Sequence, residues 1–298
     1  GSTQRLSAVQ AEAHVVPMST TPPEMGPPAL SEHSLGGLLD ETFSIYFRHF
    51  WRFAKLSAPV QLPCGIVSIL LLELFHGPAL TEAVAFVVAA FVGIFGAVFL
   101  FGAGATAVGQ HYVTGDIVLL NCYQRAWWKV VSLAIIAIVA AFFLLVAPMA
   151  MLVKNEQWIA GTAAVVLIPA FALLIYWSLA VQAVVVEGYG PMEALHRSTR
   201  LIKGNWWRIF GITGVLGLIT TGLRIVATIP FMVAANIVST EPASNAAGSI
   251  LALGGVIVGI FVLPVLFIAV TLVYYDVRVR KEHFDLTALS REMGLATT

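Results

Sequence analysis

The chain has 298 residues, of which 59% are hydrophobic and only 11% are charged, and its formal net charge is zero. A soluble globular domain carries roughly 25% charged residues, so this composition excludes a soluble globule and predicts a surface that faces lipid. The zero net charge gives no indication of nucleic-acid binding, and no nucleic acid is expected as a partner.

The N-terminal segment, residues 1–37, has no apolar stretch of the kind that forms a cleavable signal peptide. It carries prolines among Ser, Thr and Glu, and this composition predicts a disordered tail. The prolines are Pro17, Pro22, Pro23, Pro27 and Pro28. A membrane domain is expected over 38–285, followed by a C-terminal tail over 286–298.

Six apolar segments within 38–285 are predicted to cross the membrane as helices, because each approaches or exceeds the approximately 20 residues that a crossing needs. The first, about 56–75, is the weakest, since Pro59 and Pro63 fall in its first turns, where a helix tolerates proline. The other five are expected at about 83–110, 130–153, 159–186, 207–236 and 249–275.

The basic residues are distributed unevenly along the chain. Fourteen of the 16 Lys and Arg lie in the N-terminal segment, near 111–129, near 187–208, or in the C-terminal segment. The three opposite connections hold only Lys154, and Arg224 lies inside a span. By the positive-inside rule, both termini and the two longer loops are expected in the cytoplasm.

A short pattern recurs where each odd-numbered span begins: an aromatic residue, a Trp, a basic residue and an apolar residue. Amphipathic segments suited to the membrane interface precede it, most clearly near 38–50 and 191–202. The predicted fold is therefore an all-α membrane protein with six transmembrane helices, built as three repeats of a cytoplasmic interfacial helix and a two-span hairpin. The alternative is that any span entering from the cytoplasm carries Trp and Arg there. The expected interfacial anchors are Trp51, Arg52, Trp128, Lys129, Trp207 and Arg208.

Arg224 is the one basic residue predicted deep inside a span, where insertion scales assign it a cost of about 2.5–3.5 kcal/mol. Glu73 is expected at a similar depth. One hypothesis is that the two form an intramembrane polar pair or together line a polar cleft. The other is that Arg224 extends to the outer headgroups.

A second group of charges is expected at the cytoplasmic membrane level. Asp276 and Arg280, and likewise Lys281 and Asp285, are spaced for pairing along one helix face. We favour an ion-pair cluster that ties the third interfacial helix to the last span; the alternative is a phosphate or headgroup site built from the arginines. The candidate residues are Glu187, Arg197, Arg200, Asp276, Arg278 and Arg280.

No catalytic motif is found in the sequence, so a non-enzymatic protein is expected, without cofactor or metal. The histidines have no ligand spacing to one another, and packing is the expected role of His49, His111, His196 and His283. Cys64 and Cys122 are expected to be free thiols.

Three blocks of the sequence resemble the glycerophosphoryl diester phosphodiesterase membrane-domain family, over roughly residues 38–292. They are Leu39–Phe43 running to Arg52, Val185–Gly188 continuing through Ala194, Arg197-Ser198 and Lys203–Trp207, and Tyr275–Glu282 with Asp285. Nothing in the chain resembles the phosphodiesterase barrel fused to some members. The resemblance therefore implies a six-span module of the plasma membrane of a prokaryote, concerned with lipids or lipid-derived polar groups. It does not imply the fused enzyme's activity.

The leading functional hypothesis is a non-catalytic module that binds lipid or an amphiphile and supports lipid transport or envelope homeostasis. A secondary transporter or channel with a path near Arg224 is a second hypothesis. A scaffold or accessory subunit of a membrane complex is a third. Membrane lipids are the expected partners, with a membrane-protein partner or a second copy of the chain as further options.

Overall fold

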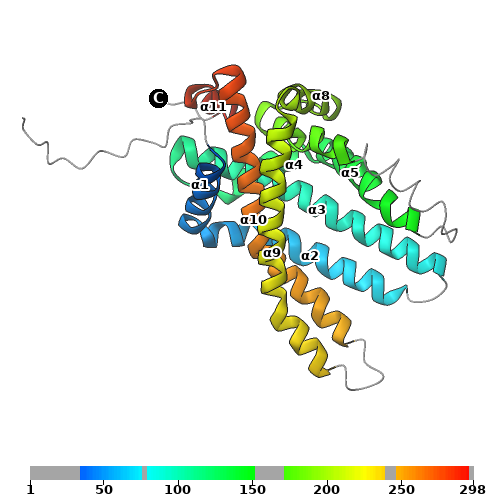
Figure 1. The fold of residues 1–298 in the computed structure, drawn as a ribbon. Coiled ribbons are helices and arrows are strands. Elements are labelled where there is room, and N and C mark those ends of the chain that lie inside the picture. The colour runs from blue at the N-terminus through cyan, green and yellow to red at the C-terminus, as the bar shows by residue number, and fades with distance from the viewer. Residues whose placement is uncertain (1–33, 76–78, 152–170, 239–245, 295–298) are drawn as a thin grey trace, which may run out of the picture.

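The computed structural model describes residues 34–75, 79–151, 171–238 and 246–294, and the described part is helical without strands (Figure 1). Within these described ranges, five helices of more than 20 residues form the body. They are α2 (Phe50–Leu74), α3 (Ala79–Thr114), α5 (Val130–Met151), α9 (Trp206–Val238) and α10 (Ala246–Glu282). Short helices precede, connect or follow the long ones. They are α1 (Leu35–Arg48), α4 (Leu119–Trp128), α7 (Ala180–Gln182), α8 (Pro191–Ile202) and α11 (Leu286–Glu292).

In the part of the chain that the structure describes, four helices are each long and apolar enough to cross a membrane, namely α2, α3, α9 and α10. Two bent pairs reach the same criterion only when each pair is counted as one span. They are Leu119–Trp128 with Val130–Phe142, bent by 72°, and Phe171–Glu187 with Pro191–Ile202, bent by 120°. These four to six candidate spans are consistent with a multi-pass membrane protein. The count of six stays a prediction, and the expected span 159–186 lies partly outside the described residues.

The helix boundaries differ from the expected spans in a consistent direction. α2 begins at Phe50, six residues before the predicted start, so Pro59 and Pro63 lie in the helix interior and not in its first turns. α10 likewise runs on to Glu282, past the predicted end at residue 275. An apolar segment marks only the part of a helix that meets hydrocarbon, whereas the hydrogen-bonded helix continues through its polar ends.

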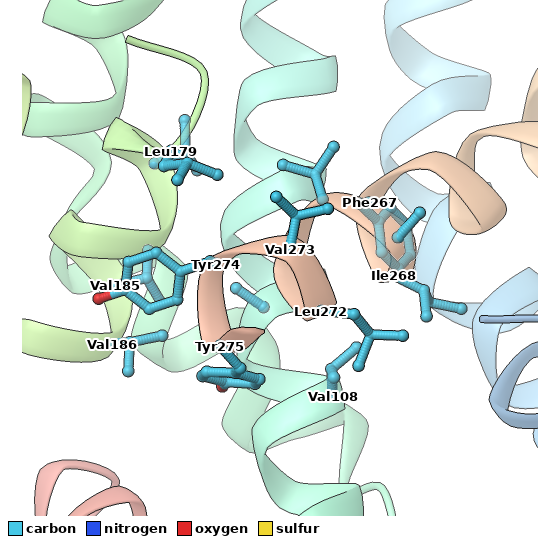
Figure 2. Packing of buried hydrophobic residues seen from close by; sticks show 14 of the residues in the cluster. Val108, Leu179, Val185, Val186, Phe267, Ile268, Leu272, Val273, Tyr274 and Tyr275 are labelled. Carbon is cyan, nitrogen blue, oxygen red and sulfur yellow. The ribbon is translucent and has the colours of Figure 1, made fainter. Parts of the chain in front are cut away.

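Helix α10 is the centre of the molecule. In its most apolar window 72% of residues are buried, compared with 11–28% in the other three candidate spans. It contacts α1, α2, α3, α8 and α9. Figure 2 shows Phe267, Leu272, Val273, Tyr274 and Tyr275 of α10 packed among side chains of α3 and of the segment 179–187.

Close approach of α3 to α10 depends on Gly104. A Cβ at this position would lie 2.2 Å from the ring of Phe267, which is fully buried. Such a contact is well inside van der Waals distance, so the pair of a glycine and a large aromatic residue fixes how α3 and α10 pack.

The three short helices α1, α4 and α8 precede α2, α5 and α9, as the sequence predicts. Each has side chains that are buried against the rest of the protein. The face of α8 predicted from its spacing is buried, namely Ala194, Leu195, Ser198, Leu201 and Ile202. Tyr46 of α1 donates a hydrogen bond of 2.9 Å to the Phe261 carbonyl of α10. Gly204, with φ +91°, lets the chain turn sharply between α8 and α9.

Both predicted terminal tails contain helical residues that the sequence did not predict. Ser34 caps α1 by accepting from the Gly37 amide, so helix begins three residues before the expected boundary at residue 38. The rest of the expected N-terminal tail, residues 1–33, lies outside the described residues. Within the expected C-terminal tail, Leu286–Glu292 forms α11, which contacts α3.

Candidate functional site

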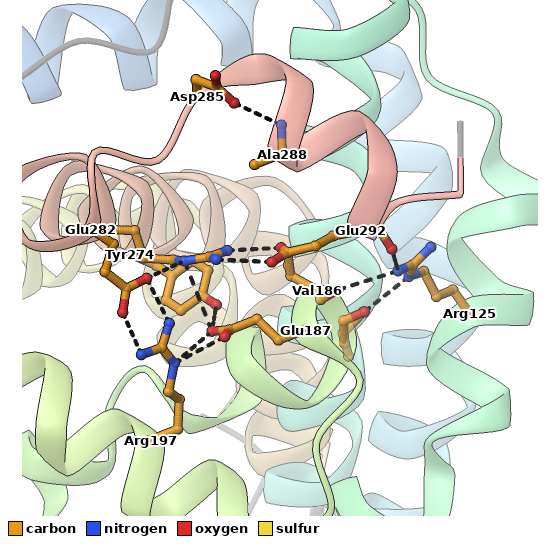
Figure 3. Close-up of polar contacts among 11 residues, drawn as sticks. Arg125, Val186, Glu187, Arg197, Tyr274, Glu282, Asp285, Ala288 and Glu292 are labelled. Carbon is orange, nitrogen blue, oxygen red and sulfur yellow. Dashed lines mark hydrogen bonds and ion pairs between the residues drawn. The ribbon is translucent and has the colours of Figure 1, made fainter. Parts of the chain in front are cut away.

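An ion-pair cluster joins α8, α10, α11 and the segment before α8 at one end of the molecule (Figure 3). We use "ion-pair cluster" for Glu187, Arg197, Tyr274, Arg278, Glu282 and Glu292. Arg197 lies at its centre and binds two carboxylates. Its Nε donates to both oxygens of Glu187, at 2.9 and 3.1 Å, and its Nη2 donates to Glu282 at 2.7 Å. Tyr274 also donates to Glu187. α8 is thereby tied to the end of α10.

Arg278 is the second guanidinium of the ion-pair cluster and is only 5% exposed. Its two terminal nitrogens donate to the two oxygens of Glu292, at 2.8 and 2.9 Å, in the parallel bidentate arrangement that favours arginine over lysine. Its Nε donates to Glu282 at 3.2 Å, and its guanidinium carbon lies 3.6 Å from the ring centroid of Phe284. These contacts hold α11 against α10.

Arg125 of α4 lies beside the cluster and binds only backbone carbonyls. It donates to Val185 at 2.9 Å and Val186 at 3.3 Å, and to Glu292 at 2.6 Å and Met293 at 2.9 Å. Residues Ala183–Glu187 form a π-helical turn that ends at Gly188, with φ +83°. A π-helical turn shifts the hydrogen-bonding register, and two of its carbonyls find their donor in Arg125.

The remaining residues predicted for this region have separate places. Asp276 is 2% exposed and receives Arg280 at 3.1 Å, the predicted i, i+4 pair, and also Arg208 at 2.9 Å. The predicted Lys281–Asp285 pair is absent from the described residues, because α10 ends at Glu282 and Asp285 instead accepts from the Ala288 amide to cap α11. Arg200 is exposed.

These contacts bear on the two hypotheses for the cytoplasmic charges. Arg197, Arg278 and Arg280 all have carboxylate partners, so an incoming phosphate would have to displace an internal ion pair. The arrangement agrees with an ion-pair cluster between α8 and α10, extended by Glu292 of α11.

The three predicted anchor motifs share a geometry that the sequence did not indicate. Each Trp is well exposed: Trp51 by 69%, Trp128 by 85% and Trp207 by 77%. Each following basic residue, however, contacts protein further along the chain. Arg52 pairs with Asp116 just beyond α3, Lys129 donates to the Gly188 carbonyl at 2.7 Å, and Arg208 pairs with Asp276 near the end of α10.

A cleft of about 570 Å³ lies between α2, α3, α9 and α10. Its size falls within the range of about 300–1,000 Å³ that is usual for ligand pockets. The wall is mostly apolar, with five glycines and the polar side chains of Gln61, Ser68, Thr220, Thr221 and Arg224. We refer to it below as the Arg224 cleft.

The glycines of the Arg224 cleft are of two kinds. At Gly65 and Gly259 a Cβ would collide with side chains of the facing helix, since it would lie 2.3 Å from Val256 and 2.4 Å from Gln61. These glycines permit close packing of α2 on α10. At Gly93 and Gly255 a Cβ would meet nothing within 4 Å. Those two positions border open space, and larger side chains there would fill the cleft.

Arg224 and Glu73 are not brought together as an ion pair in the described part of the chain. Glu73 accepts from the Ser249 hydroxyl at 3.3 Å and is not part of the cleft wall. The exposed Arg224 side chain has neither a hydrogen bond nor an ion pair with any residue that the structure describes. Arg224 therefore lines a mostly apolar cleft without Glu73, and neither the predicted pair nor a cleft lined by both residues is seen among the described residues.

Two histidines without ligand spacing in the sequence, for which packing was expected, lie together. His49, between α1 and α2, and His111 of α3 place Nε2 and Nδ1 3.1 Å apart. Burial, followed by the positive charges of Arg52 and Arg48, lowers the pKa of His49. Among the described residues no group of three or more His, Cys, Asp and Glu side chains is arranged to hold a metal ion. Only the fold could reveal this pair, because its members are 62 residues apart.

Residues 43–249 match a family model described as Domain of unknown function (DUF7847). The chain belongs to this family. The matched region of the DUF7847 family extends from α1 to the start of α10 and includes Arg125, Arg197 and Arg224. No curated protein and no solved structure matches the chain. The DUF7847 description names no activity, so the resemblance to glycerophosphoryl diester phosphodiesterase membrane domains stays a prediction.

Proposed function

We propose that the protein is a non-catalytic integral membrane module that binds a lipid or another amphiphile in the Arg224 cleft, and so supports lipid transport or envelope homeostasis. The cleft carries the proposal. It combines an apolar wall with an arginine that has no partner among the described residues, and it lies between four helices that are long and apolar enough to span a membrane. A molecule with an apolar chain and a polar head is complementary to such a cavity.

The proposal includes six spans, arranged as three repeats of an interfacial helix and a hairpin, with both termini in the cytoplasm of a prokaryote. The anchor contacts support the repeat. In each unit the basic residue that opens the hairpin, Arg52, Lys129 or Arg208, contacts an acceptor close to where that hairpin ends. The same kind of contact recurs in each of the three units. A shared composition of Trp and basic residues at the membrane entrance does not explain this recurrence.

The test is lipid retention and lipid-dependent stability of the purified full-length protein. We expect native mass spectrometry in mild detergent to detect co-purifying lipid, and lipid added after delipidation to raise the melting temperature. Filling the cleft with Gly255→Leu should reduce both effects. Gly214→Leu is the matched control, since Gly214 is exposed on α9 outside the cleft and its Cβ would also meet nothing within 4 Å. Equal lipid binding by both variants would contradict the proposal.

A transporter with an aqueous path past Arg224 is the second candidate, favoured by the position of this arginine among four candidate spans. Cys64 lines the same cleft and is a free thiol, whereas the free Cys122 is fully buried. A charged, membrane-impermeant thiol reagent that modifies Cys64 in intact vesicles would favour a water-filled path. Modification by a permeant reagent alone would favour a lipid-filled cleft, and Cys64→Ala identifies the labelled site.

A further inference from the structure

The polar groups that border the Arg224 cleft have an imbalance of charge. Among the described residues, those that line it include one guanidinium and no carboxylate. Glu73, the acidic residue expected at the same depth, contacts Ser249 instead. A cationic group in an apolar setting, without an internal counter-ion, attracts an anion more strongly than it would in water, because the surrounding dielectric constant is low.

Two other polar side chains of the Arg224 cleft, one beside Arg224 and one at the opposite end, add hydrogen-bond donors. Thr221 lies three residues before Arg224, on the same face of α9, and its exposed hydroxyl has no hydrogen-bond partner among the described residues. Gln61 also borders the cleft, and its buried Nε2 has no partner in the described structure. Arginine carries five donors in a planar fork that matches the oxygens of a phosphate.

The position of Arg224 along α9 indicates where a charged head would lie. Arg224 is 18 residues beyond Trp206, which corresponds to about 27 Å at 1.5 Å per residue. A hydrocarbon core is about 30 Å thick, so a guanidinium at this height is close to the boundary opposite Trp206. Ser68 is equally far, about 27 Å, from the start of α2 at Phe50.

The other end of the cleft is nearer the middle of the membrane. Gln61 is 11 residues, or about 16 Å, beyond Phe50. The mostly apolar cleft also borders Gly93 and Gly255, where a Cβ would meet nothing within 4 Å, so these positions leave room for a chain. The cleft thus runs from a cationic mouth near one boundary toward the midplane, which is the direction of an acyl chain in a bilayer leaflet.

We infer that the Arg224 cleft is selective for an anionic phospholipid of the surrounding bilayer, in the leaflet opposite the Trp206 end. Arg224 and Thr221 bind the phosphate, and an acyl chain lies along Gly93 and Gly255. This inference rests on the proposed function and specifies its ligand. A zwitterionic head fits less well, because its ammonium group finds no carboxylate in the cleft wall.

The experiment compares phosphatidylglycerol and phosphatidylcholine with identical acyl chains, titrated into the delipidated full-length protein in neutral detergent. Binding is followed by native mass spectrometry and by the shift in melting temperature. We expect the wild-type protein to bind phosphatidylglycerol about 10-fold or more tightly than phosphatidylcholine, the ratio expected for one charge-assisted contact. Arg224→Gln should abolish the preference and leave phosphatidylcholine binding unchanged. Arg224→Lys should retain part of it.

Two controls separate the site from general charge and from soluble anions. Lys55→Gln removes an exposed positive charge from α2 outside the cleft and should leave the preference intact. Inorganic phosphate alone should give no stabilisation, since the inference requires the acyl chain.

The possible outcomes distinguish the inference from the proposed function. If Arg224→Gln keeps the preference, or if inorganic phosphate stabilises as well as the lipid does, the anionic-phospholipid site is refuted. Binding of both lipids with equal affinity by the wild-type protein also refutes it, but leaves lipid binding in place. If the wild-type protein binds neither lipid, the proposed function fails together with the inference.

Discussion

Replacing Arg197 by Met is expected to lower stability more than any other single change of a charge on α8. The substitution retains an unbranched side chain but removes the fork that joins Glu187 to Glu282. The Arg197 and Glu187 side chains are 13% and 7% exposed, so solvent screens this pair little. Glu282 is 31% exposed, and its share is correspondingly smaller.

The expected loss of stability in Arg197→Met follows from this difference in exposure between Glu187 and Glu282. Removing one partner of a buried pair costs about 3–5 kcal/mol, because the other charge stays buried, while an exposed pair contributes about 0–1 kcal/mol. Arg278 remains 4.0 Å from Glu187 and offsets part of the loss, which favours the lower end of the range. A loss of about 3 kcal/mol corresponds to a decrease in melting temperature of about 6–12 °C.

The assay is thermal unfolding of the full-length protein in one detergent, with Arg200→Met as the matched control. Arg200 is on the same helix but exposed, so its replacement should change stability by less than about 0.5 kcal/mol. Glu187→Gln combined with Arg197→Met should recover part of the loss, because no unpaired carboxylate then remains at residue 187. If Arg197→Met unfolds at the same temperature as Arg200→Met, the ion-pair cluster does not stabilise the fold and this reasoning is wrong.

Three further predictions concern packing, carbonyl capping and pH. Gly104→Ala places a methyl group against the Phe267 ring and should cost about 1–3 kcal/mol, while Gly211→Ala, whose Cβ meets nothing within 4 Å, should be neutral or stabilising in thermal unfolding. In Arg125→Lys the single ammonium group cannot donate to all four carbonyls. Because two of these carbonyls belong to Glu292 and Met293, amide hydrogen exchange across α11 should rise. The pKa of His49 is lowered in the folded protein, so as the pH falls the unfolded chain binds a proton on this histidine before the folded protein does. The contribution of His49 to stability should therefore be fully present above about pH 6.5 and be lost as the pH falls below it.

Each of these has an outcome that would contradict it. Equal melting temperatures for the two alanine variants would mean that Gly104 does not set the α3–α10 distance. Unchanged exchange in α11 would remove Arg125 from the docking of that helix. For the histidine, the difference in stability between pH 7.5 and pH 5.5 should be smaller in His49→Gln than in the wild-type protein, and an identical difference would assign the effect to other groups.

The sequence predicted the existence of the long helices better than it predicted the residues at which they begin and end. Apolar length is sufficient to find α3, α9 and α10, and helical spacing identified the buried face of α8. The start of α2 was wrong because its first residues include polar and aromatic side chains of the anchor motif. α11 was missed since seven residues of mixed polarity have no periodic signal, and Arg278 and Glu292 hold it in place.

The cost of an arginine inside a span was enough to single out Arg224, but its predicted pairing with Glu73 is not seen among the described residues, for a geometric reason. Distance along a helix gives depth in a membrane, but it does not give the direction in which a side chain points. Glu73 contacts Ser249, whereas Arg224 faces a cleft with no carboxylate in its wall. In the same way, His49, between α1 and α2, contacts His111 of α3 only because the fold brings these segments together. Pairings between distant segments depend on the fold and have no local signal.

The contacts of Arg125 set an order for biosynthesis. Its first two acceptors, on Val185 and Val186, follow it by about 60 residues, and its last two follow by 167 and 168. At about 5–20 residues per second, a ribosome reaches the last two about 8–34 s after Arg125. Throughout this interval the guanidinium needs water, lipid phosphate or the insertion machinery as a substitute. We therefore expect docking of α11 to be a late step of assembly, and chains stopped before Glu292 to be recognised by quality-control proteases.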